Sequence, residues 1–110
     1  MLKQQPLYPM AKTTGEELPT HPGSRGEILN AARECVLKDR AATHGPVEDS
    51  FATIAKIWSA RLGVEIRADQ VAIMMIDLKG VRAWSNPQHL DNWVDMAGYG
   101  ACGGELASAI

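Results

Sequence analysis

The sequence predicts an all-α domain, a four-helix bundle-like fold, preceded by an extended arm. Apolar residues recur at spacings of three and four through most of residues 24–110, and no stretch shows the strict alternation of a β-strand. Proline and glycine divide this region into four segments of helical length. Residues 1–23 hold four of the six prolines and no periodic pattern, which is typical of an extended or disordered segment. We therefore expect an arm over 1–23 and a helical domain over 24–110.

Length, charge and hydropathy limit the class of protein. The 110 residues have room for one domain, and a net charge of −2 argues against binding to nucleic acid or to an anionic membrane. The longest apolar run, residues 71–76, is far shorter than the ~18 residues of a membrane span. The N-terminus has no signal-peptide pattern, so a cytoplasmic location is expected. Cys35 and Cys102 lack metal-ligand spacing and are expected to be free thiols.

The first two predicted helices each carry one apolar stripe. Ser24 and Glu27 form a capping box, and the helix that follows is expected to run to about residue 42. Its stripe consists of Ile28, Ala32 and Val36, with Leu29 and Cys35 beside them. Gly45 and Pro46 then break the chain and open a second helix over 46–62. The stripe of this second helix consists of Phe51, Ile54, Ala55, Trp58 and Leu62.

The third predicted helix, over residues 69–84, is apolar on every side in its first half. Such a helix is buried on every side, so we expect a central helix covered by another subunit of a homo-oligomer, either a dimer or a tetramer. Asp77 follows this apolar run, and if buried it needs a cation, a metal or strong donors. Lys79 and Arg82 share a different face of the helix. Trp84, at its end, is the tryptophan freest to touch a ligand.

The fourth predicted helix opens at Asn86-Pro87 and carries two acids one turn apart. Its apolar stripe consists of Leu90, Trp93, Val94, Ala97 and Ala101. Beside that stripe, Asp91 and Asp95 point the same way and repel each other, so they are expected to take a cation. That cation is Mg²⁺ (with Mn²⁺ as the alternative), or it is Lys79 or Arg82; a solvated acidic face at a helix start is the simpler interpretation. The glycines from 98 to 104 indicate close approach of another helix or a ligand, or fraying after Tyr99.

Carboxylates on three helices could converge in the interior of such a bundle and hold a metal ion. The candidates are Glu48, Asp49, Asp77, Asp91 and Asp95. Glu48 and Asp49 are explained equally well by the dipole of the second helix, which favours acids in its first turn. His44 is either a turn residue or a donor to phosphate.

Five groups of residues between 25 and 104 form one combined pattern. They are Arg25-x-x-Ile28-Leu29, Arg40-x-x-x-His44-Gly45-x-x-x-Asp49-x-Phe51, Ile54-Ala55-x-x-Trp58, Asp69-x-Val71-Ala72-x-Met74-Met75 with Lys79 and Arg82, and His89-x-Asp91-Asn92-x-x-Asp95-x-x-Gly98-Tyr99. No single group is specific, but together they resemble an uncharacterised family of small proteins common in bacteriophages and prophages. The resemblance covers essentially the whole helical domain.

That family is in turn similar to the all-α MazG-type nucleotide pyrophosphohydrolases. Those enzymes hold Mg²⁺ with E-x-x-E on one helix and E-x-x-D on a later one, and they cleave a nucleoside triphosphate to a monophosphate and pyrophosphate. The resemblance implies catalysis by Asp91 and Asp95, with the five carboxylates above on the metal. It implies substrate binding by Lys79, Arg82, His44, Asn92 and Trp84. In a phage-encoded protein the reaction would take place in the host cell cytoplasm.

Two departures from the enzyme pattern leave other functions open. Phe51 stands where the first motif has its second acid, and Asn92 stands where the second motif has glutamate. The second hypothesis is therefore a non-catalytic phage protein that sequesters or senses a nucleotide, in an anti-defence or regulatory role. The third is a structural interaction module whose acids pair with Lys79, Arg82 and Arg40.

Overall fold

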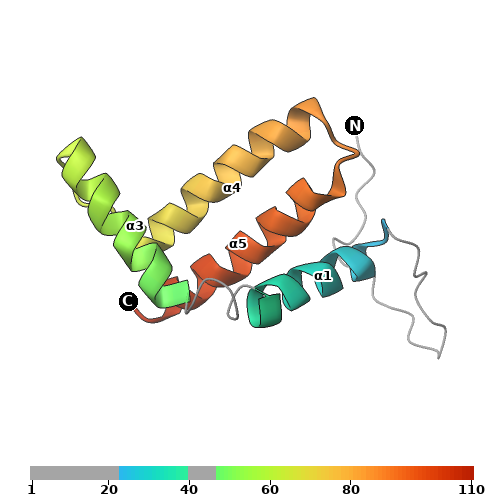
Figure 1. Cartoon of the computed structure of the whole chain (residues 1–110), viewed down its shortest axis with the longest axis horizontal. Coiled ribbons are helices and arrows are strands. Elements are labelled where there is room, and N and C mark those ends of the chain that lie inside the picture. The colour runs from blue at the N-terminus through green and yellow to red at the C-terminus, as the bar shows by residue number, and fades with distance from the viewer. Residues whose placement is uncertain (1–22, 40–46) are drawn as a thin grey trace, which may run out of the picture.

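The computed structural model describes residues 23–39 and 47–110, and every regular element in these ranges is helical (Figure 1). In chain order the elements are α1 (Arg25–Glu34), the π-helical turn η1 (Cys35–Asp39), α3 (Val47–Leu62), α4 (Ala68–Ser85) and α5 (Leu90–Ser108). The predicted all-α fold with four helices is thus confirmed. The predicted arm lies outside the described residues apart from Gly23.

The central helix of the described chain is α5, and not the segment 69–84 that the sequence analysis placed there. Figure 1 shows α4 and α5 as an antiparallel pair, with α1 along the other side of α5 and α3 crossing one end of α4. Along much of its length α4 has a described helix on one side only, and part of its apolar surface is exposed. The expected second subunit remains a prediction.

Two glycines explain why α5 takes the central place. A Cβ atom added at Gly98 would lie 3.2 Å from Cγ1 of Val36, and one added at Gly103 would lie 2.9 Å from Cβ of Ala72. The glycines therefore let η1 and α4 approach the α5 backbone from two sides. The close approach predicted from the sequence is confirmed, whereas fraying after Tyr99 does not occur, because α5 continues to Ser108.

The hydrophobic core lies where α3, α4 and α5 meet. Phe51 is 1% exposed, and Val71 and Ala72 are fully buried. The remaining core residues are Ala55 and Cys102, with Val36, Ile54, Trp58, Ile66, Ala68, Met75, Tyr99 and Leu106 packed against them. The predicted stripe of the second helix is confirmed at all positions but Leu62, which is 62% exposed. In α1, Ala32 is buried as predicted, but Leu29 is exposed.

Local hydrogen bonds set the helix ends. The Oγ of Ser24 accepts from the backbone N–H of Glu27 at 3.2 Å, as its predicted capping role requires. Gly63 has φ +74°, the left-handed conformation that favours glycine at the end of a helix. The hydroxyl of Ser59 then accepts from the backbone N–H of Ile66 at 2.8 Å, which fastens the linker to α3. These contacts hold α3 and α4 at a fixed crossing.

An exposed ion pair supports the start of α4. The guanidinium of Arg67 donates from Nε to Oδ1 of Asp69 at 3.0 Å and from a terminal nitrogen to Oδ2 at 3.2 Å. These hydrogen bonds hold the pKa of Asp69 below its ordinary value of 3.8 and raise the pKa of Arg67. The backbone N–H of Arg67 also donates to the side chain of Gln70, which satisfies one of the free amides near the helix start.

One predicted helix boundary is wrong. Asn86 caps the C-terminus of α4 rather than opening the next helix, and α5 begins at Leu90 with His89 as its N-cap. The indole N–H of Trp93 donates to the carbonyl of Pro87 at 2.9 Å, which holds Pro87 in the turn between the helices. The first predicted helix continues after Glu34 as a π-helical turn to Asp39, and its predicted end at about residue 42 lies outside the described residues.

The predicted apolar stripe of α5 is also wrong as a core stripe. Leu90 is 39% exposed and Trp93 is 45% exposed. The buried residues of the helix are instead Asn92, Gly98 and Cys102. Small side chains at 98 and 102 allow a closer approach of neighbouring helices than Trp93 would, and this closeness decides which side of α5 packs. Within the described ranges, no helix has both the length and the hydropathy of a bilayer span.

Candidate functional site

An ion pair joins α4 to α5 in the interior of the hairpin. Nζ of Lys79 lies 2.8 Å from Oδ2 of Asp95, and the two side chains are 16% and 33% exposed. Of the cations that the sequence analysis considered for Asp95, the structure places Lys79 at the carboxylate. Because both groups are partly removed from water, the attraction between them is stronger than in an exposed pair.

Asn92 lies one turn before Asp95 on α5 and is only 5% exposed. Its backbone N–H donates to the carbonyl of His89 at 3.1 Å, but its side chain makes no hydrogen bond to any residue that the structure describes. A buried amide without a partner costs about 1–3 kcal/mol relative to a satisfied one. Lys79, Asn92 and Asp95 are hereafter called the inner polar set. They place three polar side chains where a purely structural helix pair would carry apolar ones.

A small hollow borders Asp95 on the side away from α4. Asp95, Tyr99 and Cys102 of α5 face Cys35 and Val36 across it, and Val94 and Gly98 complete its wall. Its volume is about 50 Å³, enough for a water molecule or a phosphate oxygen but not for a whole nucleotide. Neither Cys35 nor Cys102 forms a disulfide, as predicted.

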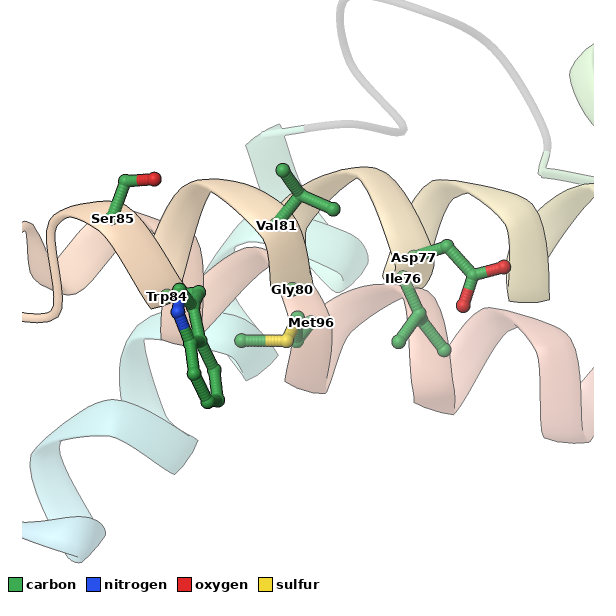
Figure 2. A pocket seen from close by; sticks show the side chains of 7 residues that line it. All are labelled: Ile76, Asp77, Gly80, Val81, Trp84, Ser85 and Met96. Carbon is green, nitrogen blue, oxygen red and sulfur yellow. The ribbon is translucent and has the colours of Figure 1, made fainter.

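A second, larger groove of about 630 Å³ lies along α4, on the side of this helix that faces away from Lys79 (Figure 2). It is lined by Ile76, Asp77, Gly80, Val81, Trp84, Ser85 and Met96, the last from α5. Trp84 is 88% exposed, which agrees with its predicted freedom to touch a ligand. Asp77 is the charged member of this lining, so the groove repels phosphate rather than binding it.

The predicted site residues are therefore divided between two sides of α4. Lys79 and Asp95 come together in the interior, whereas Asp77 and Trp84 lie on the outer side, away from them. Asp91 and Arg82 are exposed. His44 and the side chains of Glu48 and Asp49 lie outside the described residues.

The described carboxylates do not by themselves fit a magnesium site. Among the residues whose side chains the structure describes, which leave out Asp39, Glu48 and Asp49, no three His, Cys, Asp or Glu are grouped closely enough to hold a metal ion. Asp95, moreover, is already neutralised by Lys79. A complete set of ligands would need Glu48 and Asp49, so the metal centre stays a prediction.

Sequence reasoning named Asn92 as a substrate contact but did not foresee its burial. The available signal was the spacing of the α5 residues that face the interior. Asn92, Tyr99, Gly103 and Leu106 follow one another at intervals of seven, four and three, which is a helical stripe. The stronger apolar content of the neighbouring stripe, with Leu90 and Trp93, concealed it.

Comparisons with known proteins agree with the resemblance noted for residues 25–104. The family model described as "Domain of unknown function (DUF6378)" matches residues 27–107. The Gene 55 protein of Mycobacterium phage L5 is 41% identical over 73 residues, which are 66% of this chain and 47% of that protein. The Gene 55 protein of Mycobacterium phage D29 is 35% identical over 75 residues, which are 68% of this chain and 50% of that protein.

This chain thus spans about half the length of the curated relatives that it matches. No solved structure matches it. The matching model covers most of the helical domain, including α4, α5 and the inner polar set. The chain therefore belongs to the DUF6378 family, an uncharacterised family that has relatives in bacteriophages.

Proposed function

We propose that this chain binds a nucleoside triphosphate at the inner polar set and cleaves it, with Mg²⁺, to a nucleoside monophosphate and pyrophosphate. One observation carries the proposal, namely that Asn92 is 5% exposed and its side chain has no hydrogen-bond partner among the described residues. The proposal also follows the resemblance to MazG-type enzymes, in which Asn92-x-x-Asp95 stands at the position of the second acidic motif.

A buried amide without a hydrogen-bond partner lowers the stability of the folded chain. Packing alone would be served better by an apolar side chain at this position. Replacing such a group by an apolar one of similar shape is often neutral or stabilising, so its presence calls for another explanation. A ligand that hydrogen-bonds the amide supplies that explanation. Asn92 offers both a donor and an acceptor, which suits a nucleobase edge or a phosphate oxygen.

Lys79 supplies the charge that a phosphate needs. Its side chain is 16% exposed and its ammonium lies at Asp95, so a phosphate that competes for Lys79 would also release the carboxylate. A magnesium ion held by Asp95 together with Glu48 and Asp49 would neutralise phosphate charge and lower the pKa of a bound water. The hollow beside Asp95 holds only about 50 Å³. The resemblance implies that His44, which lies outside the described residues, also contacts the nucleotide. Such a reaction belongs to the cytoplasm of a phage-infected host cell.

Binding without turnover is the second candidate, and the ion pair favours it. A carboxylate already neutralised by Lys79 at 2.8 Å is a poorer metal ligand than a free one. The absence of a three-residue acidic group among the described residues points the same way. In this case the inner polar set would bind a nucleotide without cleaving it, and Mg²⁺ would not be required.

The test is a thermal-shift panel of nucleoside triphosphates with Mg²⁺, with Mn²⁺ and with EDTA, followed by an assay for released pyrophosphate. A nucleotide at ~100 times its Kd should stabilise the wild type by roughly 2.7 kcal/mol. The variant Asn92→Leu should lose this shift. Glu105→Gln, an exposed change on the same helix, should retain it.

The outcomes separate the candidate functions. Pyrophosphate release that disappears in Asp95→Ala supports the hydrolase. Stabilisation without release, unaffected by EDTA, supports nucleotide sequestration. If no nucleotide shifts the melting temperature of the wild type, both nucleotide functions are wrong, and the interaction module remains.

A further inference from the structure

The outer side of α4 exposes an unusually apolar surface for a helix of a small domain. Ile73, Asp77, Gly80, Val81 and Trp84 share this side, and we call these five residues the outer face. Ile73 is 54% exposed, Val81 is 69% exposed and Trp84 is 88% exposed. Adjacent exposed side chains of this size mark a surface that contacts another molecule.

We propose that a second copy of this chain covers the outer face, with the two α4 helices antiparallel across a two-fold axis near Gly80 and Val81. This inference does not depend on nucleotide binding, which concerns the opposite side of α4. The sequence predicts a homo-oligomer but no interface. The proposal names the surface, the register of the two helices and the polar contact between them.

Asp77 fixes the direction of the second helix. It is the charged member of the groove lining, and it makes no ion pair with any described residue. In a parallel pair of α4 helices, Asp77 would face Asp77 of the second copy, and the like charges would repel. In an antiparallel pair centred between residues 80 and 81, Asp77 faces Trp84 of the second copy.

Trp84 is a suitable partner for that carboxylate. The indole Nε1–H is a hydrogen-bond donor, and it makes no hydrogen bond within the described part of the chain. Residues 77 and 84 are equally far from the proposed axis, so the two-fold symmetry creates the same donor–acceptor contact twice. Each apolar indole would cover the groove of the other copy while its polar edge reaches Asp77.

The shape of the outer face also fits a second helix. An added Cβ at Gly80 meets no atom within 4 Å, so this glycine serves no close approach inside the chain. A glycine in mid-helix costs about 1 kcal/mol relative to alanine, and close contact with a second backbone would offset that cost. Covering one indole buries roughly 150–250 Å². Each copy contributes one indole with Ile73, Val81 and Met96, so the contact lies at the small end of the size range of specific interfaces, which is typical of a weak dimer.

The first experiment measures the molar mass of the full chain by light scattering and sedimentation over roughly 1–100 μM. The wild type should be a dimer. Val81→Glu places a charge at the axis and should raise the dimer Kd at least 30-fold. Leu62→Glu changes an equally exposed residue of α3 and should leave the dimer intact. Far-ultraviolet circular dichroism of each variant checks that the helices are retained.

The second experiment tests the register. A mixture of Asp77→Cys and Trp84→Cys chains, treated with oxidised glutathione, should form a mixed disulfide dimer that neither variant forms alone. Gly80→Cys should cross-link with itself, whereas Gly104→Cys, a matched open glycine on α5, should not. The wild type under the same conditions controls for Cys35 and Cys102.

Three results would overturn the proposal. The first is a wild type that stays monomeric throughout the concentration range. The second is a dimer that Val81→Glu does not weaken, because the interface would then lie elsewhere. The third is self-cross-linking of Asp77→Cys without a mixed product, which would mean a parallel pair. Within the first result, a chain that dimerises only after removal of residues 1–22 would mean that the arm, and not a second copy, covers the face.

Discussion

The two sides of α4 differ in a way that hydropathy does not explain. The inner side carries Val71 and Ala72, both fully buried. The outer side carries Ile73, Val81 and Trp84, which are at least as large and apolar and yet are between 54% and 88% exposed. On α4, burial therefore follows the position of the neighbouring helices rather than the apolar content of a stripe.

The same contrast recurs on α5. Asn92, Gly98 and Cys102 face the interior, while Leu90 and Trp93 are substantially exposed. Exposed Leu90 and Trp93 and the buried, unpartnered amide of Asn92 all lower the stability of an isolated chain. Such departures from good packing are expected at functional sites and interfaces. We interpret the outer surfaces as interfaces and the inner polar set as the functional site.

The largest expected effect comes from removing the most buried side chain of α3. Phe51→Ala should lower the free energy of unfolding by about 3–5 kcal/mol, because Phe51 is 1% exposed and fills the junction of three helices. Leu62→Ala, at a position 62% exposed on the same helix, should change it by less than about 0.5 kcal/mol. Urea denaturation followed by circular dichroism measures both. Equal losses of stability in the two variants would show that the exposed fractions of Phe51 and Leu62 do not reflect how these side chains pack.

Two adjacent glycines of α5 should respond with opposite signs. Gly103→Ala brings a methyl group to 2.9 Å from Cβ of Ala72 and should cost about 1–2 kcal/mol. Gly104→Ala meets no atom within 4 Å and should stabilise the chain by about 0.5–1 kcal/mol through helix propensity. Melting temperatures and urea midpoints of the pair provide the measurement. A stabilising Gly103→Ala would mean that α4 and α5 do not approach as closely as described.

Asn92→Leu should make the chain more stable by about 1 kcal/mol, because it removes a buried amide that has no partner among the described residues. The same change should abolish the response to nucleotide. Asn86→Leu, at an exposed position in the turn between α4 and α5, is the matched control and should not stabilise the chain. Urea denaturation without ligand tests the first effect. Destabilisation by Asn92→Leu would indicate a structural role for the amide.

The smallest effect concerns pH. The pKa of Asp69 is lowered in the folded state by hydrogen bonds from Arg67, so the unfolded chain takes up a proton at Asp69 at higher pH than the folded chain does. The stabilisation is complete above the ordinary value of 3.8 and is lost as the pH falls through the lowered folded-state pKa. Asp69→Asn should therefore flatten the acid limb of stability below about pH 4 and reduce stability slightly at neutral pH. Because the pair is exposed, added salt should weaken its contribution. An acid limb that is the same in both proteins would assign the loss to other carboxylates.

The fold was accessible from the sequence because strong local signals mark each helix. The apolar period through Phe51, Ala55 and Trp58, the cap at Ser24 and the stop at Gly63 all have direct counterparts in the structure. The start of α5 was missed because Asn86 and Pro87 suit a helix cap and a turn equally well, and only the tertiary contact of Trp93 with Pro87 decides between them.

The site was less accessible, because its geometry depends on which sides of two helices meet. The sequence named Lys79 and Asp95, but the ion pair between them requires the observed packing of α4 on α5. It also grouped Asp77 and Trp84 with them, although helix rotation places these two on the outer face. Packing of Gly103 against Ala72 sets that rotation, and no local pattern encodes it.

The side-chain amide of Asn92 offers the most direct test of the central claim. The chain contains three asparagines, and Asn30 and Asn86 are exposed, so their side-chain amides are internal controls in a nitrogen–proton correlation spectrum. Titration with a nucleoside triphosphate that stabilises the protein should shift the Asn92 side-chain amide signals and leave those of Asn30 and Asn86 in place. Unchanged Asn92 signals at saturating nucleotide would contradict the assignment of the inner polar set as the nucleotide site.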